Sequence, residues 1–280
     1  MGGNSSKSPP VTPAPSPELK CPWRSVNWST KQEILKHLNV LKPSVEPLRI
    51  LLYGPAGAGK SCFINSVQRA LLGCNASSSL ESSAGAGESS TLSIKSYKLK
   101  KRGGGHYPFV FSDIIVLDPS KGGIHTEDII KVLEGRILEG YKFDAASPIT
   151  EDDPKYNHCP NLCDKVHCLV YVLPSDSTAP NVIEKIRKIQ EKASKSIPKV
   201  IVLTKVDKVS EMVNRDLRKV YHSKKIEEKV EDCSDKLTIL SDNIHPVKNY
   251  HAEVNEDANV DVLILMALRN IVKLANNYAK

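Results

Sequence analysis

Residues 54–61 combine three glycines, a lysine and a serine in the order GPAGAGKS. This order fits G-x-x-x-x-G-K-[ST], in which the glycines let the backbone wrap closely and turn its N–H groups toward phosphate oxygens. Lys60 would reach the β- and γ-phosphates, and the Ser61 hydroxyl would ligate Mg²⁺. An apolar run (48–53) precedes the loop, and an amphipathic segment (61–73) follows it. The context therefore predicts a strand, a phosphate-binding loop and a helix whose positive N-terminal end adds to phosphate binding.

The first predicted nucleotide-binding residues come from this loop and from the start of the helix. Cys62 is expected to lie beside the loop and to face the core. The alternative is a glycine-rich turn that binds nothing. The predicted cofactor-binding residues of this segment are Gly54, Gly57, Ala58, Gly59, Lys60, Ser61 and Cys62.

A second polar motif, TKVD (204–207), ends the apolar run KVIVLTKVD (199–207). Ligands of open α/β sheets bind at the carboxyl ends of the strands, so both motifs are expected at one edge. Asp207 can accept two hydrogen bonds from guanine N1–H and N2–H₂, a pair of donors that adenine lacks. Lys205 would lie along the base, and Thr204 would tether the loop. Alone, TKVD also fits a solvated strand end; together with GPAGAGKS it favours GTP or GDP.

Two further contacts are expected around Mg²⁺ and the γ-phosphate. An Asp at the end of the next core strand would hold Mg²⁺ through water, and a Gly in a D-x-x-G pattern would sense the γ-phosphate. Asp118 ends FVFSDIIVLD (109–118), but the chain continues as DPSKGG (118–123), with lysine where the glycine is expected. A hydroxyl from the preceding polar loop is also expected, and Thr91 is preferred to Ser90. The predicted metal ligands are Ser61, Thr91 and Asp118.

Intrinsic GTP hydrolysis is expected to be slow. No glutamine follows Asp118 where it could position a water molecule, and no in-built arginine finger is evident. His125 and Glu127 lie nearby, but each fits a surface helix cap equally well. No catalytic residue is therefore named.

The elements that would position these residues alternate between strand and helix. Such alternation implies a largely parallel sheet covered on both faces, here a P-loop GTPase-like three-layer α/β sandwich with one antiparallel hairpin strand. The domain prediction is a disordered Pro/Ser-rich tail (1–22), a helical prelude (23–46) stopped by a proline, and a P-loop G domain (47–280). Strands are predicted at 48–53, 92–100, 109–118, 166–174, 199–207 and 237–240, and helices at 61–73, 126–141, 182–193 and 259–280.

Composition limits the functional classes. The 280 residues carry a net charge of +7 and only 5% aromatic side chains, so no basic and aromatic stripe for nucleic acid is expected. No apolar run is long enough to span a membrane, and the N-terminus lacks the apolar stretch of a secretory signal. Seven cysteines are an odd number for a disulfide framework, and a reducing cytoplasmic location is therefore expected.

Two segments outside the nucleotide motifs suggest further chemistry. MGGNSS matches M-G-x-x-x-[ST], which predicts N-myristoylation of Gly2 and weak, reversible membrane association. The basic turn KLKKRGGG (98–105) could supply a second, electrostatic contact. The cysteines and histidines between His158 and Cys168 raise a zinc site as an alternative, but their spacing does not match paired zinc ligands.

At this point the residues resemble a known family, interferon-induced protein 44 and 44-like. The shared segments occur in the family's order and cover about residues 22 to 280. They are PWRSVNW, LRILLYGPAGAGKSCFINSV, TEDIIKVLEGRILEGYKF, VHCLVYVLPSDS and HPVKNYH.

The resemblance implies a cytoplasmic P-loop G domain with a role in the interferon and antiviral response. GTP binding is inferred for the family from its motif, and Gly54, Lys60 and Ser61 carry over directly. TKVD is a fuller guanine motif than expected in some relatives, whereas DPSKGG departs from the family's D-x-x-G-like segment. NYH (249–251) follows HPVK where a base-contacting loop would lie, and no base contact is assigned to it.

Two functions fit these observations. The first is a guanine-nucleotide (GTP/GDP) and Mg²⁺-binding protein with slow or partner-dependent hydrolysis and GTP-dependent self-association. The second is a non-hydrolysing pseudo-GTPase scaffold that acts at membranes through an immune-signalling protein partner. The intact loop and TKVD favour the first, and DPSKGG favours the second. TKVD argues against an ATP-dependent kinase.

Overall fold

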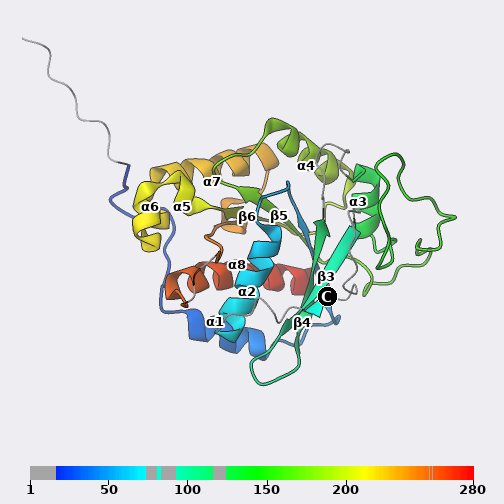
Figure 1. Cartoon of the computed structure of the whole chain (residues 1–280), viewed down its shortest axis with the longest axis horizontal. Coiled ribbons are helices and arrows are strands. Elements are labelled where there is room, and N and C mark those ends of the chain that lie inside the picture. Colours follow the sequence, from blue (N-terminus) through cyan, green and yellow to red (C-terminus); the bar gives the residue numbers. More distant parts are fainter. Residues whose placement is uncertain (1–16, 74–80, 83–92, 116–123, 252, 254) are drawn as a thin grey trace, which may run out of the picture.

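A computed structural model of the chain describes residues 17–73, 81–82, 93–115, 124–251, 253 and 255–280. In this part of the chain, a seven-stranded sheet has the order β2-β3-β4-β1-β5-β6-β7 (Figure 1). Strands β4, β1, β5, β6 and β7 run parallel to one another, and β3 is antiparallel to both β2 and β4. The predicted α/β fold, with a mostly parallel sheet and an antiparallel hairpin strand, is confirmed.

The described elements alternate between strand and helix as expected. The strands are β1 (Leu48–Tyr53), β2 (Glu81–Ser82), β3 (Ser93–Lys100), β4 (His106–Ile115), β5 (Cys168–Pro174), β6 (Lys199–Thr204) and β7 (Ile244–Pro246). The α-helices are α1 (Lys31–Asn39), α2 (Lys60–Leu72), α3 (Thr126–Leu133), α4 (Pro180–Lys192), α5 (Val206–Val209), α6 (Glu211–Arg215), α7 (Lys224–Leu237) and α8 (Ala258–Tyr278). Two 3₁₀ helices are η2 (Leu217–His222) and η3 (Ser241–Asn243).

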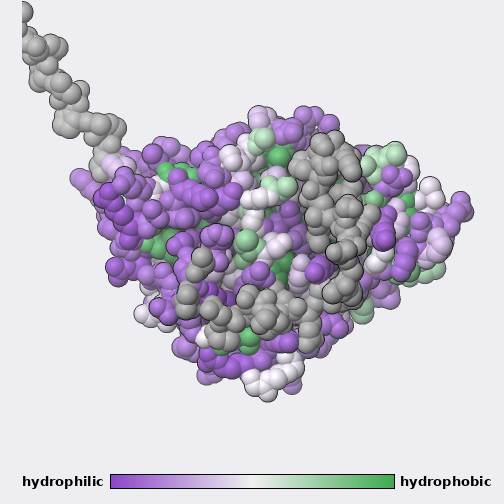
Figure 2. All heavy atoms as spheres, viewed as in Figure 1, coloured by the Kyte–Doolittle hydropathy of each residue, from purple (hydrophilic) through white to green (hydrophobic). Residues whose placement is uncertain are grey.

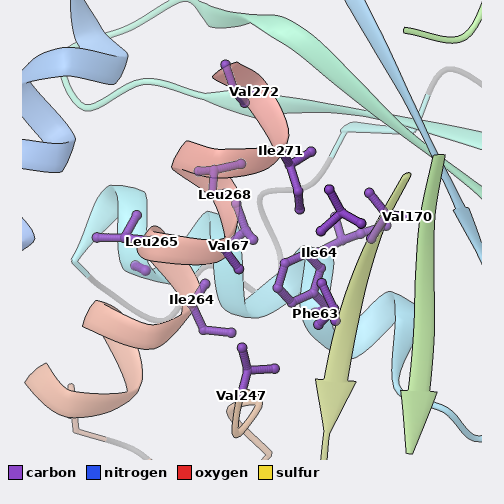
Figure 3. Packing of buried hydrophobic residues seen from close by; sticks show 14 of the residues in the cluster. Phe63, Ile64, Val67, Val170, Val247, Ile264, Leu265, Leu268, Ile271 and Val272 are labelled. Carbon is purple, nitrogen blue, oxygen red and sulfur yellow. The ribbon is translucent and has the colours of Figure 1, made fainter. Parts of the chain in front are cut away.

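Helices cover both faces of the sheet because the central strands are apolar on both sides. Alternate residues of β5 face different cores: Val170 packs with α1, α2 and α8, whereas Tyr171 packs with α3, α4 and most of α7. In Figure 3, Val67 of α2 lies near Leu268 of α8, and Phe63 lies beside Ile64 on the side toward Val170; all five belong to one buried cluster. A strand buried on both faces is typical of parallel sheets, and this packing fixes the position of α2 at the end of β1.

Two local predictions were wrong, and one long helix was missed. The predicted helix 126–141 ends at Leu133 because Gly135 has φ +75°, and a side chain there would meet the backbone of Asp164 at 2.6 Å. The predicted strand 237–240 is the end of α7 and the turn after it, and the last strand is β7 instead. Helix α7 itself was not predicted.

The segment before the helical prelude lies on the folded domain from residue 17 onward. The backbone N–H of Leu19 donates to the carbonyl of His222 at 2.8 Å, and the backbone N–H of Trp23 donates to the carbonyl of Tyr221 at 3.0 Å. The guanidinium of Arg24 donates to the carbonyl of Ile244 in β7 at 2.8 Å. The last residues of the predicted tail, 17–22, thus contact η2 and the turn after it.

The side chains on one face of the molecule are visible in a space-filling view (Figure 2). The face in Figure 2 is mainly hydrophilic, and its hydrophobic areas are small and separated. Within the described ranges, no helix combines the length and apolar character needed to cross a bilayer.

Candidate nucleotide-binding site

The glycine-rich loop (residues 54–61) joins the carboxyl end of β1 to α2. A Cβ atom at Gly54 would lie 2.1 Å from the carbonyl oxygen of Val172, so only glycine lets the loop pass β5. Gly57 and Gly59 have φ values of +73° and +92°, which side chains rarely tolerate. The glycines are therefore required by the path of the chain, and this path brings the loop close to the sheet edge.

Lys60 and Ser61 begin α2, and both side chains are engaged. The Lys60 ammonium donates to the carbonyl oxygens of Gly54 at 2.9 Å and Pro55 at 3.2 Å. Burial lowers the pKa of Lys60, and the charge of Asp113 opposes this shift. The Ser61 hydroxyl donates to Oδ2 of Asp113 at 2.8 Å. The lysine therefore lies along the loop, and the serine links the loop to β4.

Asp113 is a functional candidate that sequence reasoning missed. Its side chain is buried, with 2% exposure, and burial raises its pKa against the effects of Lys60 and Ser61. Its Oδ1 atom has no hydrogen-bond partner among the described residues. Asp118, which was predicted for this position, lies outside the described residues, as do the last three positions of the predicted strand 109–118; β4 is described as far as Ile115.

A signal for Asp113 was present in the sequence. It is an acidic residue within the otherwise apolar run FVFSDIIVLD, and a carboxylate in a buried strand requires a partner or a function. Counted from Asp113, the D-x-x-G pattern places Val116 where the glycine is expected. Thr91 and Gly2 also lie outside the described residues, so the contacts predicted for them stay predictions.

The TKVD motif lies beside the glycine-rich loop, at the carboxyl end of β6. The Thr204 hydroxyl donates to the carbonyl of Ala58 at 2.6 Å, which is the expected tether between segments 146 positions apart. Lys205 has φ +60°, a left-handed conformation that costs a non-glycine residue free energy and is common at functional sites. The Asp207 carboxylate is partly exposed, and no hydrogen bond or ion pair is found for it among the described residues.

A cavity of about 390 Å³ connects the two motifs. Gly57, Gly59 and Cys62 line it from the glycine-rich loop and α2, and Lys205 and Asp207 line it from the TKVD motif. Cys62 was expected to face the core, and this was wrong: its side chain is exposed. The apolar residues that follow it in α2 fill the core instead.

A third segment, the loop after β7, forms the remaining wall of this cavity. Its lining residues are Lys248, Asn249, Tyr250, His251 and Glu253. Sequence reasoning assigned no contact to this segment. The carboxyl ends of β1, β6 and β7 meet at one edge because these strands are parallel members of one sheet, and this explains the convergence of the three loops.

The residues present fit a nucleotide phosphate with Mg²⁺. The buried lysine and the backbone of the loop can donate hydrogen bonds to phosphate oxygens, and the Ser61 hydroxyl and the Asp113 carboxylate offer oxygen atoms to a cation. The unpaired Oδ1 of Asp113 is an acceptor for which a cation or its bound water is a suitable partner. Hard oxygen ligands of this kind suit Mg²⁺.

The zinc alternative finds no support at His167, one of the two histidines that raised it. Nδ1 of His167 accepts from the backbone N–H of Arg49 at 2.8 Å, and Nε2 lies 3.0 Å from the carbonyl of Leu162. Both ring nitrogens are therefore occupied by backbone groups. Among the described residues, no group of three or more His, Cys, Asp or Glu side chains is arranged to hold a metal ion.

Fold and site together define the class of the protein: an α/β three-layer sandwich, consistent with P-loop proteins, with a glycine-rich loop at the carboxyl edge of its sheet. No protein-family model matches the chain. Its curated homologues are interferon-induced proteins 44 and 44-like, which confirms the resemblance predicted from the sequence.

The similarity extends over most of the chain. Interferon-induced protein 44 of Mus musculus is 32% identical over 252 residues, which cover 88% of this chain and 59% of that protein. The Homo sapiens protein of the same name is 31% identical over 256 residues, which cover 89% and 57%. Interferon-induced protein 44-like of Homo sapiens is 32% identical over 243 residues, which cover 84% and 53%. The chain thus spans 53–59% of the length of these relatives.

Proposed function

We propose that the protein binds GTP and GDP with Mg²⁺. The observation that carries this proposal is the single cavity lined both by the glycine-rich loop and by the TKVD motif. Residues proposed to bind phosphate and residues proposed to bind the base, which are far apart in the sequence, thus line one cavity at the carboxyl edge of the sheet, the usual ligand position in such folds.

The residues of the site divide between phosphate and base. Lys60 and the N-terminal end of α2 favour phosphate, and Ser61 and Asp113 would hold Mg²⁺, which neutralises phosphate charge when it is bound. The Asp207 carboxylate can accept the N1–H and N2–H₂ donors of guanine. Adenine would leave this carboxylate unsatisfied, so ATP is expected to bind more weakly.

Hydrolysis of GTP is proposed to be slow or to depend on a partner. Neither reading of the D-x-x-G pattern retains its glycine: Lys121 follows Asp118 at that spacing, and Val116 follows Asp113. This feature favours, as a second candidate, a scaffold that binds nucleotide without hydrolysing it. Similarity to interferon-induced protein 44 supports an interferon-linked immune role for either candidate.

Equilibrium titration of nucleotide-free protein with GTP, GDP and ATP in the presence of Mg²⁺ tests the proposal. We expect GTP and GDP to bind at least tenfold more tightly than ATP. Asp207→Asn should lose this preference, since it loses charge-assisted hydrogen bonds worth about 1.5–3 kcal/mol. Lys60→Ala should weaken the binding of all three nucleotides. The matched control for Asp207→Asn is Asp242→Asn, in η3 before β7. Absence of nucleotide binding by the wild type would refute both candidates, since each of them binds nucleotide.

A further inference from the structure

Asn249 connects the loop after β7 to the glycine-rich loop. Its Nδ2 donates to the carbonyl oxygen of Gly59 at 3.1 Å. The preceding carbonyl, that of Ala58, accepts from the Thr204 hydroxyl at 2.6 Å. Two consecutive carbonyl groups of the loop are therefore held by side chains from two different strand ends. The contact is close, because a Cβ atom at Gly59 would lie 2.9 Å from this amide nitrogen.

The orientation of these carbonyls decides the orientation of the following N–H groups. In a planar trans peptide unit the carbonyl and the N–H point in opposite directions. The carbonyl of Gly59 also accepts from the backbone N–H of Phe63 at 2.8 Å, so Asn249 adds a second donor to it. Fixing this carbonyl aims the N–H of Lys60, and fixing the carbonyl of Ala58 aims the N–H of Gly59. These are backbone donors of the kind that a phosphate-binding loop presents to its ligand.

The segment that carries Asn249 is itself held firmly on α2. The N–H of Tyr250 donates to the Ser66 hydroxyl at 2.9 Å. The Arg69 guanidinium donates to the carbonyls of Glu253 at 2.6 Å and Asn255 at 2.5 Å, and it lies 4.0 Å from the centre of the Tyr250 ring. The amide that contacts Gly59 thus has a fixed support, which a positioning residue needs.

Stability alone does not account for this arrangement. With the amide nitrogen turned toward Gly59, the Oδ1 atom of Asn249 is buried and lacks a partner among the described residues. An unpaired buried acceptor costs free energy, and such groups cluster where function requires them. The favourable hydrogen bond to Gly59 therefore comes with a cost, as is common at binding sites.

We propose that Asn249 is a positioning residue that, with Thr204, fixes the glycine-rich loop relative to the base-binding segment and so sets the affinity for phosphate. This inference rests on the proposed function and deepens it. Asn249 acts on the backbone donors of the loop and not on the base. Loss of the Asn249 side chain should therefore lower the affinity for ligands that carry phosphate and leave the affinity for ligands without phosphate unchanged.

Comparison of GDP with guanosine tests this division. In Asn249→Ala, we expect the affinity for GDP to fall about three- to tenfold, as for the loss of one hydrogen bond, and the affinity for guanosine to stay within twofold. Asn249→Asp keeps the shape but loses the donor, so it should lose at least as much affinity for GDP. An equal loss for both ligands would mean that Asn249 contacts the base, and no loss would remove its role; either result overturns the inference.

A second measurement does not require any nucleotide. Amide hydrogen exchange of a peptide covering residues 54–62 should be faster in unliganded Asn249→Ala than in the wild type. Asn270→Ala is the matched control, because the Asn270 amide donates to the Asn243 side chain at 3.1 Å in η3, before β7. If the wild type binds neither GDP nor guanosine, the proposed function fails while the exchange rates still test Asn249. Unchanged exchange in the Asn249→Ala loop would refute its positioning role.

Discussion

Replacement of Asp113 by asparagine tests the assignment of the acidic residue at the site. The Asp113 carboxylate is buried, and burial raises its pKa. Its Oδ1 atom has no hydrogen-bond partner among the described residues. Burying the charge costs free energy that a neutral amide avoids, although the amide also leaves one buried polar atom unpaired. Asparagine removes the charge and can still accept from Ser61. Asp113→Asn should therefore stabilise the unliganded protein by about 1 kcal/mol, which corresponds to a rise of about 2–4 °C in Tm.

The same change should weaken Mg²⁺ binding. Loss of a carboxylate that holds a metal through its water or directly lowers metal affinity about 10–100-fold. The assay is a Mg²⁺ titration of the protein with a fluorescent GTP analogue, together with thermal unfolding in a chelator. Because the pKa of Asp113 is raised, the wild type should also lose Mg²⁺ affinity on acidification at a higher pH than an ordinary aspartate would, since a protonated carboxyl no longer attracts the cation.

Asp118→Asn is the matched control, because Asp118 was the sequence-based choice for the same role. We expect its Mg²⁺ affinity and Tm to equal those of the wild type. If Asp118→Asn lost Mg²⁺ dependence and Asp113→Asn kept it, the assignment from the structure would be wrong. A fall in Tm for unliganded Asp113→Asn would show that the Ser61 contact outweighs the cost of the buried charge.

Three other features predict measurable effects. Gly54→Ala should lower stability by more than about 3 kcal/mol in urea unfolding, because its Cβ would overlap a backbone carbonyl; a near-normal midpoint would contradict the geometry. GDP with Mg²⁺ should slow alkylation of Cys62 by N-ethylmaleimide, measured by peptide mass spectrometry, but leave Cys159 and Cys163 unaffected; equal rates for all three would place the nucleotide elsewhere. Burial lowers the pKa of His245 to about 3, so the folded state stays neutral while the unfolded state takes up a proton below pH 6.5. The wild type should therefore lose about 2 kcal/mol between pH 7 and pH 5, and His245→Gln should lose less over this range; parallel pH curves would refute the assignment.

The sequence predicted the sheet well because its signals are local. Apolar runs such as 166–174 can only be buried on both faces, and the glycine-rich loop has few alternatives between such a strand and an amphipathic helix. Helix α7 was missed because its sequence is mostly charged, with only Ile226, Val230, Cys233 and Leu237 buried along one stripe. Four apolar positions among ten charged or polar ones give a weak periodic signal.

The site was harder to predict because its geometry depends on tertiary contacts. The sequence predicted that the segments GPAGAGKS and TKVD would lie together, and both line the cavity. These segments are recognisable because the order of residue types within each one follows from the local path of the backbone. The sequence-based choice was Asp118, at the end of the predicted strand, and it lies outside the described residues; Asp113 was not considered because a strand end is located from the sequence only to within two to four residues. Asn249 had no local signal at all: its role depends on a hydrogen bond to Gly59, 190 positions away.

The contact between Arg24 and the carbonyl of Ile244 has a consequence for how the domain can be trimmed. Strand β7 is the last strand of the row, and an uncovered sheet edge can pair with the edge of another molecule. The guanidinium covers one acceptor of this edge, and Trp23 packs on Tyr221 beside it. A shortened chain beginning at residue 47 would keep every predicted nucleotide-binding residue and still lose this protection. It should therefore aggregate more readily than a chain that begins at residue 17.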